Sequence, residues 1–197
     1  MNISFNRKES VKEDLLNTTN SEEQLKKLPP HNNENHDKFR KEGQPYNLND
    51  FELQNQIGSG SFGKVYRVLL KERKKNYAAK ISKESIKNPE IDKIRDISRE
   101  VNILSKLKHP SILQFIFYSP FNFKQKPKPV IITEFAKNKS LEDLIENEKI
   151  SPTSLFSDTL KLIIIYGISS AMSYIHSHEI IHRDLKPANI LLDDYFF

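Results

Sequence analysis

The chain has 197 residues, of which 37% are hydrophobic and 29% are charged, and it carries a formal net charge of +5. A length of this order suggests one folded domain with room for a tail. The absence of cysteine excludes a disulfide framework and zinc sites built on cysteine. Because the sequence shows no apolar targeting segment and no apolar run of membrane-spanning length, we expect a cytoplasmic protein without membrane contact.

The positive charge is unevenly distributed. Residues 51–197 carry 23 Lys and Arg against 17 Asp and Glu, whereas residues 1–50 carry eight against nine. The excess is spread over loops such as 71–75 and 124–128. Charge runs of this kind are most often solvated turn residues, and a run alone does not make a nucleic-acid site. We therefore expect no nucleic-acid partner.

Residues 1–50 are rich in Asn, Lys and Glu. This composition cannot bury enough apolar surface to offset the entropy of the chain, so we predict a disordered polar tail. Within it, Ser21 followed by Gln24 is typical of a helix start and predicts a short helix over 21–28.

Regular structure is predicted from Phe51 onward, where apolar and polar residues alternate as in a half-buried strand. The predicted strands are 51–57, 64–70, 77–81, 112–118 and 130–135. A helix is expected after Asn88-Pro89-Glu90, which offers a cap, a proline at the first helical position and an acid in the first turn.

Two helices are predicted in the C-terminal part. A short one begins near Ser140, and a longer one has an apolar face made of Leu160, Ile163, Ile164, Gly167, Ile168, Ala171 and Ile175. Strands around one helix, followed by helices, indicate an α+β fold with an antiparallel sheet and a helical part.

The first motif is the glycine-rich segment Gly58-Ser59-Gly60-Ser61-Phe62-Gly63 between two predicted strands. Glycine lets backbone N–H groups approach phosphate oxygens and accepts positive φ angles. A hairpin that simply needs glycine is the alternative. A dinucleotide-binding motif would require a helix after the glycines, whereas the residues from Val65 onward favour a strand.

The second pattern joins Lys80 to Glu100. Alternation along the predicted strand puts Lys80 on the same face as Ala78. Glu100 lies at the edge of the apolar stripe of the following helix and needs a partner if it is buried. Lys80 can be that partner; taken separately, each residue is more often found on the surface.

The third motif is His182-Arg183-Asp184-Leu185-Lys186-Pro187-Ala188-Asn189, which has Lys and Asn two and five residues after the Asp. Together with the glycine-rich segment, Lys80 and Glu100 in this order, it resembles the eukaryotic-type protein kinase family. Lys186-Pro187 resembles the serine/threonine type, and the glycine-rich segment is also similar to that of the tyrosine-kinase-like branch.

The resemblance implies a protein-kinase-like fold. A complete N-terminal lobe and hinge would occupy residues 51–136, as a five-stranded antiparallel sheet with one helix. A partial helical C-terminal lobe would occupy residues 137–197.

The resemblance also implies a role for each matching residue, with ATP and Mg²⁺ as cofactors and a protein as substrate. Asp184 would accept the proton of a Ser or Thr hydroxyl, and Lys186 would neutralise charge on the transferred phosphoryl group. Glu100 would orient Lys80 toward the phosphates, Asn189 would bind Mg²⁺, and Arg183 would contact a phosphorylated loop. The remaining implied ATP contacts are Gly58, Ser59, Gly60, Gly63, Val65, Ala78, Thr133, Glu134, Ala136 and Leu191.

The chain ends at Phe197, before the Asp-Phe-Gly segment that the family would have next. We therefore expect a catalytically incomplete fragment of a serine/threonine kinase, without measurable phosphoryl transfer in isolation. Its C-terminal part should expose apolar side chains that a partner can cover. The alternatives are a truncated pseudokinase that acts as a nucleotide- or partner-binding module, and a non-functional fragment.

Overall fold

The computed structural model describes residues 46–60, 63–85, 91–152 and 156–193, and over 91–96 it describes the backbone alone. The described residues fall into two compact units. The first holds the residues up to 106 and residues 114–134, and the second holds residues 107–113 and those from 135 onward.

Some predicted features lie outside the described residues. They are the polar tail as far as residue 45, the helix over 21–28, and the helix start at Asn88-Pro89-Glu90.

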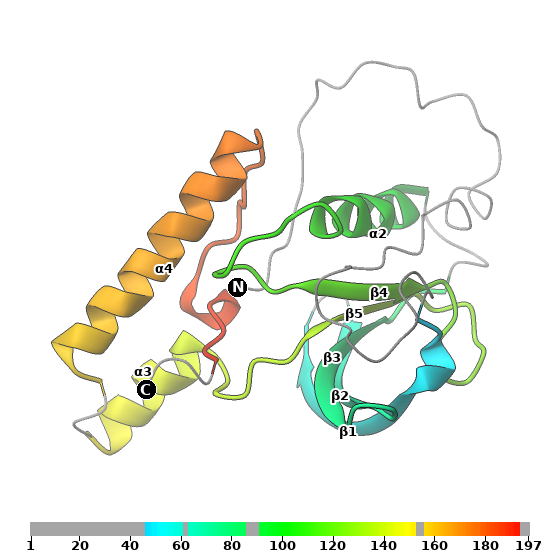
Figure 1. Cartoon of the computed structure of the whole chain (residues 1–197), viewed down its shortest axis with the longest axis horizontal. Helices are drawn as coiled ribbons and strands as arrows, with labels where there is room; N and C mark the ends of the chain where they lie inside the picture. The colour runs from blue at the N-terminus through cyan, green and yellow to red at the C-terminus, as the bar shows by residue number, and fades with distance from the viewer. Residues whose placement is uncertain (1–45, 61–62, 86–90, 153–155, 194–197) are drawn as a thin grey trace. The chain divides into compact units, whose positions relative to one another are not determined.

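The first unit is built on a five-stranded sheet with antiparallel neighbours in the order β1-β2-β3-β5-β4 (Figure 1). Its strands are β1 Phe51–Ser59, β2 Gly63–Leu70, β3 Lys75–Ser82, β4 Phe115–Ser119 and β5 Val130–Glu134. The predicted five-stranded sheet is confirmed. The start predicted for β4 at Ile112 was wrong, because the Ile112 amide donates a 3.0 Å hydrogen bond to the His109 carbonyl in a turn.

One face of this sheet carries the core of the first unit. Its buried members are Leu48, Phe51, Val68, Leu70, Tyr77, Ala79, Val130 and Ile132. Leu48 belongs to a short 3-10 helix, η1 Leu48–Asp50, in which the side chains of Asn47 and Asp50 form a capping box. Tyr46 also packs against the core. Packing therefore starts before Phe51, inside the segment predicted as a tail.

Helix α2, Ile91–Leu104, is present where the apolar stripe predicts a helix. Val101 and Leu104 are 3% and 7% exposed, as expected for the apolar face of an amphipathic helix. The side chains of residues 91–96 in this helix lie outside the described residues.

The second unit contains α3 Leu141–Ile150, α4 Asp158–Ser177 and the 3-10 turn η2 Pro187–Asn189. Ser140 caps α3, as its position in the sequence predicts: its Oγ accepts from the Asp143 amide at 3.2 Å. The Asp143 carboxylate accepts from the Ser140 amide at 3.0 Å and also from the Ser140 hydroxyl. These bonds satisfy two backbone donors that a helix start leaves without partners.

Residues 107–113 belong with this second unit, although the prediction counted them in the N-terminal lobe. The reason lies in their contacts with α4. The Lys108 amide donates to the Tyr174 hydroxyl at 3.1 Å, and His109 Nε2 lies 3.1 Å from Ser170 Oγ.

Helix α4 buries Leu160, Ile164, Ala171 and Ile175. Ile163, predicted on the same apolar face, is 47% exposed, as expected for a part of the chain that should expose apolar side chains. Further large apolar side chains of α4 are exposed, as expected for this part of the chain: Leu162, Ile165 and Tyr166. Among the described residues, no helix combines the length and apolarity needed to cross a membrane.

Candidate active site

Four predicted site residues lie on one face of the sheet, opposite the core. Val65 of β2 pairs with Lys80 of β3, and Ala78 of β3 pairs with Thr133 of β5. Directly paired residues share a face, and so do residues two apart along a strand. The strand register therefore places Val65, Ala78, Lys80 and Thr133 together.

Lys80 forms an ion pair with Glu100 of α2. Its Nζ donates a 2.6 Å hydrogen bond to Glu100 Oε1, and the two side chains are 24% and 13% exposed. Hydrogen bonds between charged groups are among the stronger ones in proteins. The pair joins β3 to α2 through two residues that are twenty positions apart in sequence, and it holds the ammonium group on the site face of the sheet.

The glycine-rich segment connects β1 to β2, and within it the Gly60 amide donates a 2.9 Å hydrogen bond to the Gly63 carbonyl. A Cβ atom on Gly63 would lie 2.2 Å from the Ile81 carbonyl oxygen, whereas one on Gly60 would meet nothing within 4 Å. None of Gly58, Gly60 and Gly63 has a φ between +20° and +160°, the region that favours glycine. A left-handed backbone is therefore not the reason for glycine at these positions; at Gly63 the reason is the close approach of β3.

The end of β5 is anchored through Glu134. Its amide donates to the Gln114 carbonyl at 3.0 Å, and its Oε1 accepts from the Gln114 amide at 3.0 Å. The Thr133 hydroxyl donates to the Glu134 carbonyl at 3.1 Å. Sequence patterns gave no signal of the Gln114 contact, because it joins residues twenty positions apart through the fold.

Asp184 is the centre of a polar cluster in the second unit. Its Oδ1 accepts from Lys186 Nζ at 3.1 Å, and its Oδ2 accepts from Asn189 Nδ2 at 2.9 Å. The same Nδ2 group donates to the Asp184 backbone carbonyl at 2.7 Å. The structure thus brings together Asp184, Lys186 and Asn189, which the sequence motif had singled out.

The loop that carries Asp184 is held on both sides. His182 is only 1% exposed, and its Nδ1 accepts from the Asp184 amide at 3.3 Å. Arg183 has a φ of 63°, an uncommon conformation for a residue other than glycine. On the other side η2 closes with a 2.9 Å bond from the Asn189 amide to the Lys186 carbonyl. The motif includes His182, but its supporting role appears only in the structure.

The residues after the loop pair with the start of α3. Leu191 forms an isolated antiparallel bridge with Ser140. Leu192 is buried against Leu160 and Ile164, while Leu191 is half-buried. Because side chains alternate along an extended segment, Leu191 faces away from that apolar cluster.

The Asp184 carboxylate has a pKa below its ordinary value of 3.8, chiefly because the Lys186 side chain donates to it and then because Asn189 does. Such a group is ionised at neutral pH. It is well suited to accept a hydrogen bond, but it is a weak base.

The fit to a metal ion rests on Asn189 and Asp184. The side-chain nitrogen of Asn189, Nδ2, donates its hydrogen bonds to Asp184. The side-chain oxygen of Asn189, Oδ1, therefore remains to bind a cation. Mg²⁺ in nucleotide sites binds one or two carboxylates and completes its shell with water and phosphate oxygens. Within the described ranges no three His, Cys, Asp or Glu residues gather into a metal-binding group. The residues present therefore fit a cation that takes its remaining ligands from water and from phosphate oxygens.

The comparisons with known proteins agree with this chemistry. The family model described as protein kinase domain matches residues 51–196. The chain is 38% identical over 74% of its length to serine/threonine-protein kinase sgk-1 of Caenorhabditis elegans. It is 34% identical over 75% to an Aurora kinase of Yarrowia lipolytica and 35% identical over 76% to Aurora kinase B of Drosophila melanogaster.

The chain spans only 30%, 37% and 44% of the lengths of these three relatives. None of the comparisons tests the similarity to the tyrosine-kinase-like branch, which stays a prediction. The family model covers well over half of the chain, and the relatives named here are serine/threonine kinases or Aurora kinases. The chain therefore belongs to the protein kinase family, in its serine/threonine group.

Proposed function

We propose that this chain binds ATP with Mg²⁺ and carries the residues that direct the γ-phosphate to a Ser or Thr hydroxyl of a protein. The observation that carries the proposal is the Asp184 carboxylate, hydrogen-bonded to both Lys186 and Asn189. In this family, phosphoryl transfer depends mainly on positioning and on neutralising charge.

We assign nucleotide binding to the face of the sheet that carries Lys80, in the first unit. Lys80 would donate to the α- and β-phosphates, with Glu100 holding its ammonium group in place. The other proposed contacts to ATP are Gly58, Ser59, Gly60, Gly63, Val65, Ala78, Thr133, Glu134, Ala136 and Leu191. Within the described part of the chain the Ala136 amide donates to no other residue, which supports its proposed role as a donor to adenine.

We assign the transfer of the phosphoryl group to residues of the second unit. Because its pKa is low, Asp184 is ionised and can accept a hydrogen bond from the substrate hydroxyl, orienting that oxygen for attack. It takes the proton as the bond from the hydroxyl oxygen to the γ-phosphorus forms and the bond from that phosphorus to the departing ADP oxygen breaks. Lys186 offsets negative charge on the phosphoryl group. Asn189 would hold Mg²⁺ through Oδ1; when bound, the ion neutralises charge on the phosphate oxygens.

The test uses the 197-residue chain and two readouts. Thermal unfolding is followed with and without ATP and Mg²⁺, and transfer is followed with γ-labelled ATP and a mixture of Ser- and Thr-containing peptides. We expect ATP with Mg²⁺ to raise the melting temperature, and Lys80→Ala to remove the shift. The matched control is Lys106→Ala, which removes an exposed lysine elsewhere in the same unit.

The outcomes separate the candidate functions. Label transfer that disappears with Asp184→Asn supports a kinase. A thermal shift without transfer limits this chain to nucleotide binding, as expected both for an incomplete kinase fragment and for the alternative, a nucleotide-binding module without catalysis. The absence of any ATP-dependent shift contradicts the proposal.

We also infer a cytosolic location from the lack of cysteine, which fractionation of cells expressing a tagged chain would test.

A further inference from the structure

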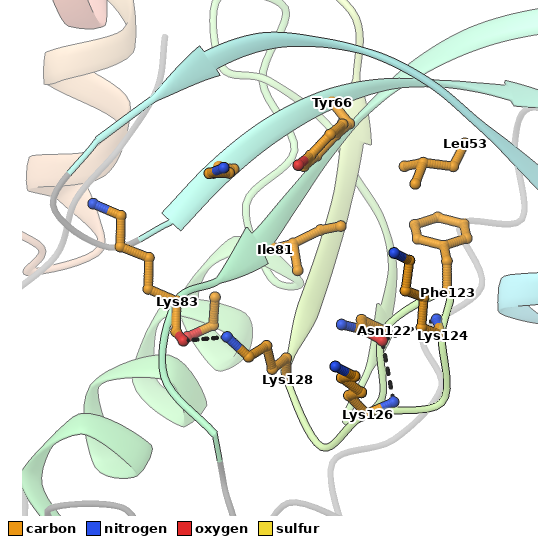
Figure 2. Close-up of a pocket in the computed structure, with 11 residues that line it drawn as sticks. Leu53, Tyr66, Ile81, Lys83, Asn122, Phe123, Lys124, Lys126 and Lys128 are labelled. Atoms are coloured by element: carbon orange, nitrogen blue, oxygen red, sulfur yellow. Dashed lines mark hydrogen bonds between the residues drawn. The ribbon is translucent and has the colours of Figure 1, made fainter.

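A cavity separate from the candidate active site lies in the first unit, on the sheet face opposite Lys80. It is a cavity of about 350 Å³ bordered by β1, β2, the end of β3 and the loop between β4 and β5 (Figure 2). Tyr66 pairs with Ala79, and Lys64 pairs with Ile81, which places the strand residues of the cavity on the core side of the sheet. None of the residues of the candidate active site lines it.

Four apolar or aromatic side chains line this cavity. Tyr66, Ile81, Phe123 and Leu53 all line it, and Figure 2 shows their side chains grouped together. Ile81 and Phe123 also pack against the core of the unit, so their positions are fixed from behind. A volume of this size lies at the lower end of the range of about 300–1,000 Å³ for ligand pockets, which suits one or two side chains.

The rim of the cavity is strongly basic. Five of the eleven lining residues are lysines, and none is acidic: Lys64, Lys83, Lys124, Lys126 and Lys128. No described carboxylate forms an ion pair with any of these lysines, and four of them are exposed to solvent. The sequence run 124–128, expected to be an ordinary solvated loop, therefore contributes to a built cavity. Uncompensated charge around a concave surface raises the local concentration of anions.

Hydrogen bonds hold the loop that supplies most of these lysines. Asn122 Oδ1 accepts from the amides of Lys124 and Lys126 at 2.9 and 3.1 Å. Lys128 Nζ donates to the Lys83 carbonyl at 2.6 Å, and the Ser82 amide donates to the Pro129 carbonyl at 2.9 Å. These bonds tie the loop to β3, so less conformational entropy is lost when a ligand binds.

We propose that this cavity is a docking site for an acidic peptide segment of another protein that carries a large apolar side chain beside its carboxylates. The apolar side chain would contact Tyr66, Ile81 and Phe123, and the carboxylates would lie against the lysine rim. Apolar anchors in a pocket give affinity, while complementary charge at the rim gives specificity and fast association. A bilayer surface or a nucleic acid backbone would satisfy the lysines but leave the apolar cavity unfilled.

The test measures fluorescence anisotropy of the full chain with a labelled peptide, Glu-Asp-Glu-Phe-Asp-Glu-Asp. The variant reverses three rim charges with Lys64→Glu, Lys124→Glu and Lys126→Glu. The control makes the same change of charge at exposed lysines away from the cavity, with Lys106→Glu, Lys108→Glu and Lys149→Glu. A second peptide has Ser in place of Phe, and urea unfolding verifies that both variants fold.

We expect the rim variant to weaken binding by about tenfold or more and the control to change it by less than about threefold. The Ser peptide should bind about fivefold or more weakly than the Phe peptide. Equal losses in the two variants, equal binding of the two peptides, or no binding would overturn the proposal. So would tighter rim-dependent binding of phosphatidylserine vesicles or oligothymidylate, since these would identify a lipid or nucleic acid as the ligand.

Discussion

Lys80 Nζ lies 2.6 Å from Glu100 Oε1, which joins the third strand of the sheet to helix α2. The partly buried pair fixes the direction of the only lysine among the proposed phosphate contacts in the first unit. Substitution of Lys80 and substitution of Glu100 should therefore weaken ATP binding to different extents.

Lys80→Ala should weaken ATP binding by about 10- to 100-fold, the equivalent of a charged hydrogen bond of about 1.5–3 kcal/mol. Glu100→Gln should weaken it less, because the ammonium group remains and loses only its charged partner. Isothermal titration with ATP and Mg²⁺ measures both affinities. Equal affinity in the wild type and Lys80→Ala would show that Lys80 does not contact the phosphates.

Gly63→Ala should destabilise the first unit by about 2 kcal/mol, because the new methyl group collides with the Ile81 carbonyl oxygen. Gly60→Ala is the matched control in the same turn. Its methyl group meets nothing within 4 Å, so the free energy of unfolding should change by less than about 0.5 kcal/mol. Urea unfolding compares the two, and a similar cost at both positions would contradict the packing argument.

Asp143→Asn tests the cap of α3 through pH. Hydrogen bonds from the Ser140 side chain and backbone hold the pKa of Asp143 below its ordinary value of 3.8. The stabilisation from its charge is therefore complete above that value, and it is lost as the pH falls through the lower pKa of the folded state. The wild type should exceed the variant in stability by about 0.5–1 kcal/mol near neutral pH.

This difference should shrink as the pH falls below 3.8, and urea unfolding at several pH values measures it. Glu142→Gln is the control, since it removes an exposed acid from the same helical turn. A difference between the wild type and Asp143→Asn that stays constant down to the lowest pH would show that the charge of Asp143 is not involved.

Lys186→Met and Asn189→Ala should each raise the pKa of Asp184, because both residues donate hydrogen bonds to its carboxylate. The larger rise is expected for Lys186→Met, since Lys186 makes the larger contribution to the lowered pKa. Carbon-13 NMR of the carboxyl group against pH reports the values directly. Lys149→Met, which removes a lysine of α3, should leave the titration unchanged; an equal rise in that variant would exclude a local cause.

Local patterns predicted most of the elements, for reasons that act over a few residues. Alternation identified the strands from Phe51 to Leu70, and Ser140 indicated the start of α3. Predictions were less accurate where distant contacts decide the outcome. Leu48 joins the core through packing against the sheet, and the segment before β4 turns at Ile112 and does not continue as a strand.

The candidate site divides in the same way. The His182 to Asn189 motif is local, since the bonds of Asp184 reach residues only two and five positions away. Its residue types and spacing were therefore enough to predict the cluster. The contact between Glu134 and Gln114 has no such pattern, because the register of β4 and β5 creates it.

The sequence by itself determined the family, the order of strands and helices and the chemical identity of Lys80, Glu100, Asp184 and Asn189, because these depend on residue type and short-range spacing. The pairing of Lys80 with Glu100 was predicted from the sequence, and the structure confirms it at 2.6 Å. Only the tertiary structure decided that Gly63 has no room for a side chain. It alone also brought Tyr66 and the lysines of the 124–128 loop around one cavity. Strand register and loop hydrogen bonds set these distances, and both arise from packing between segments far apart in the chain.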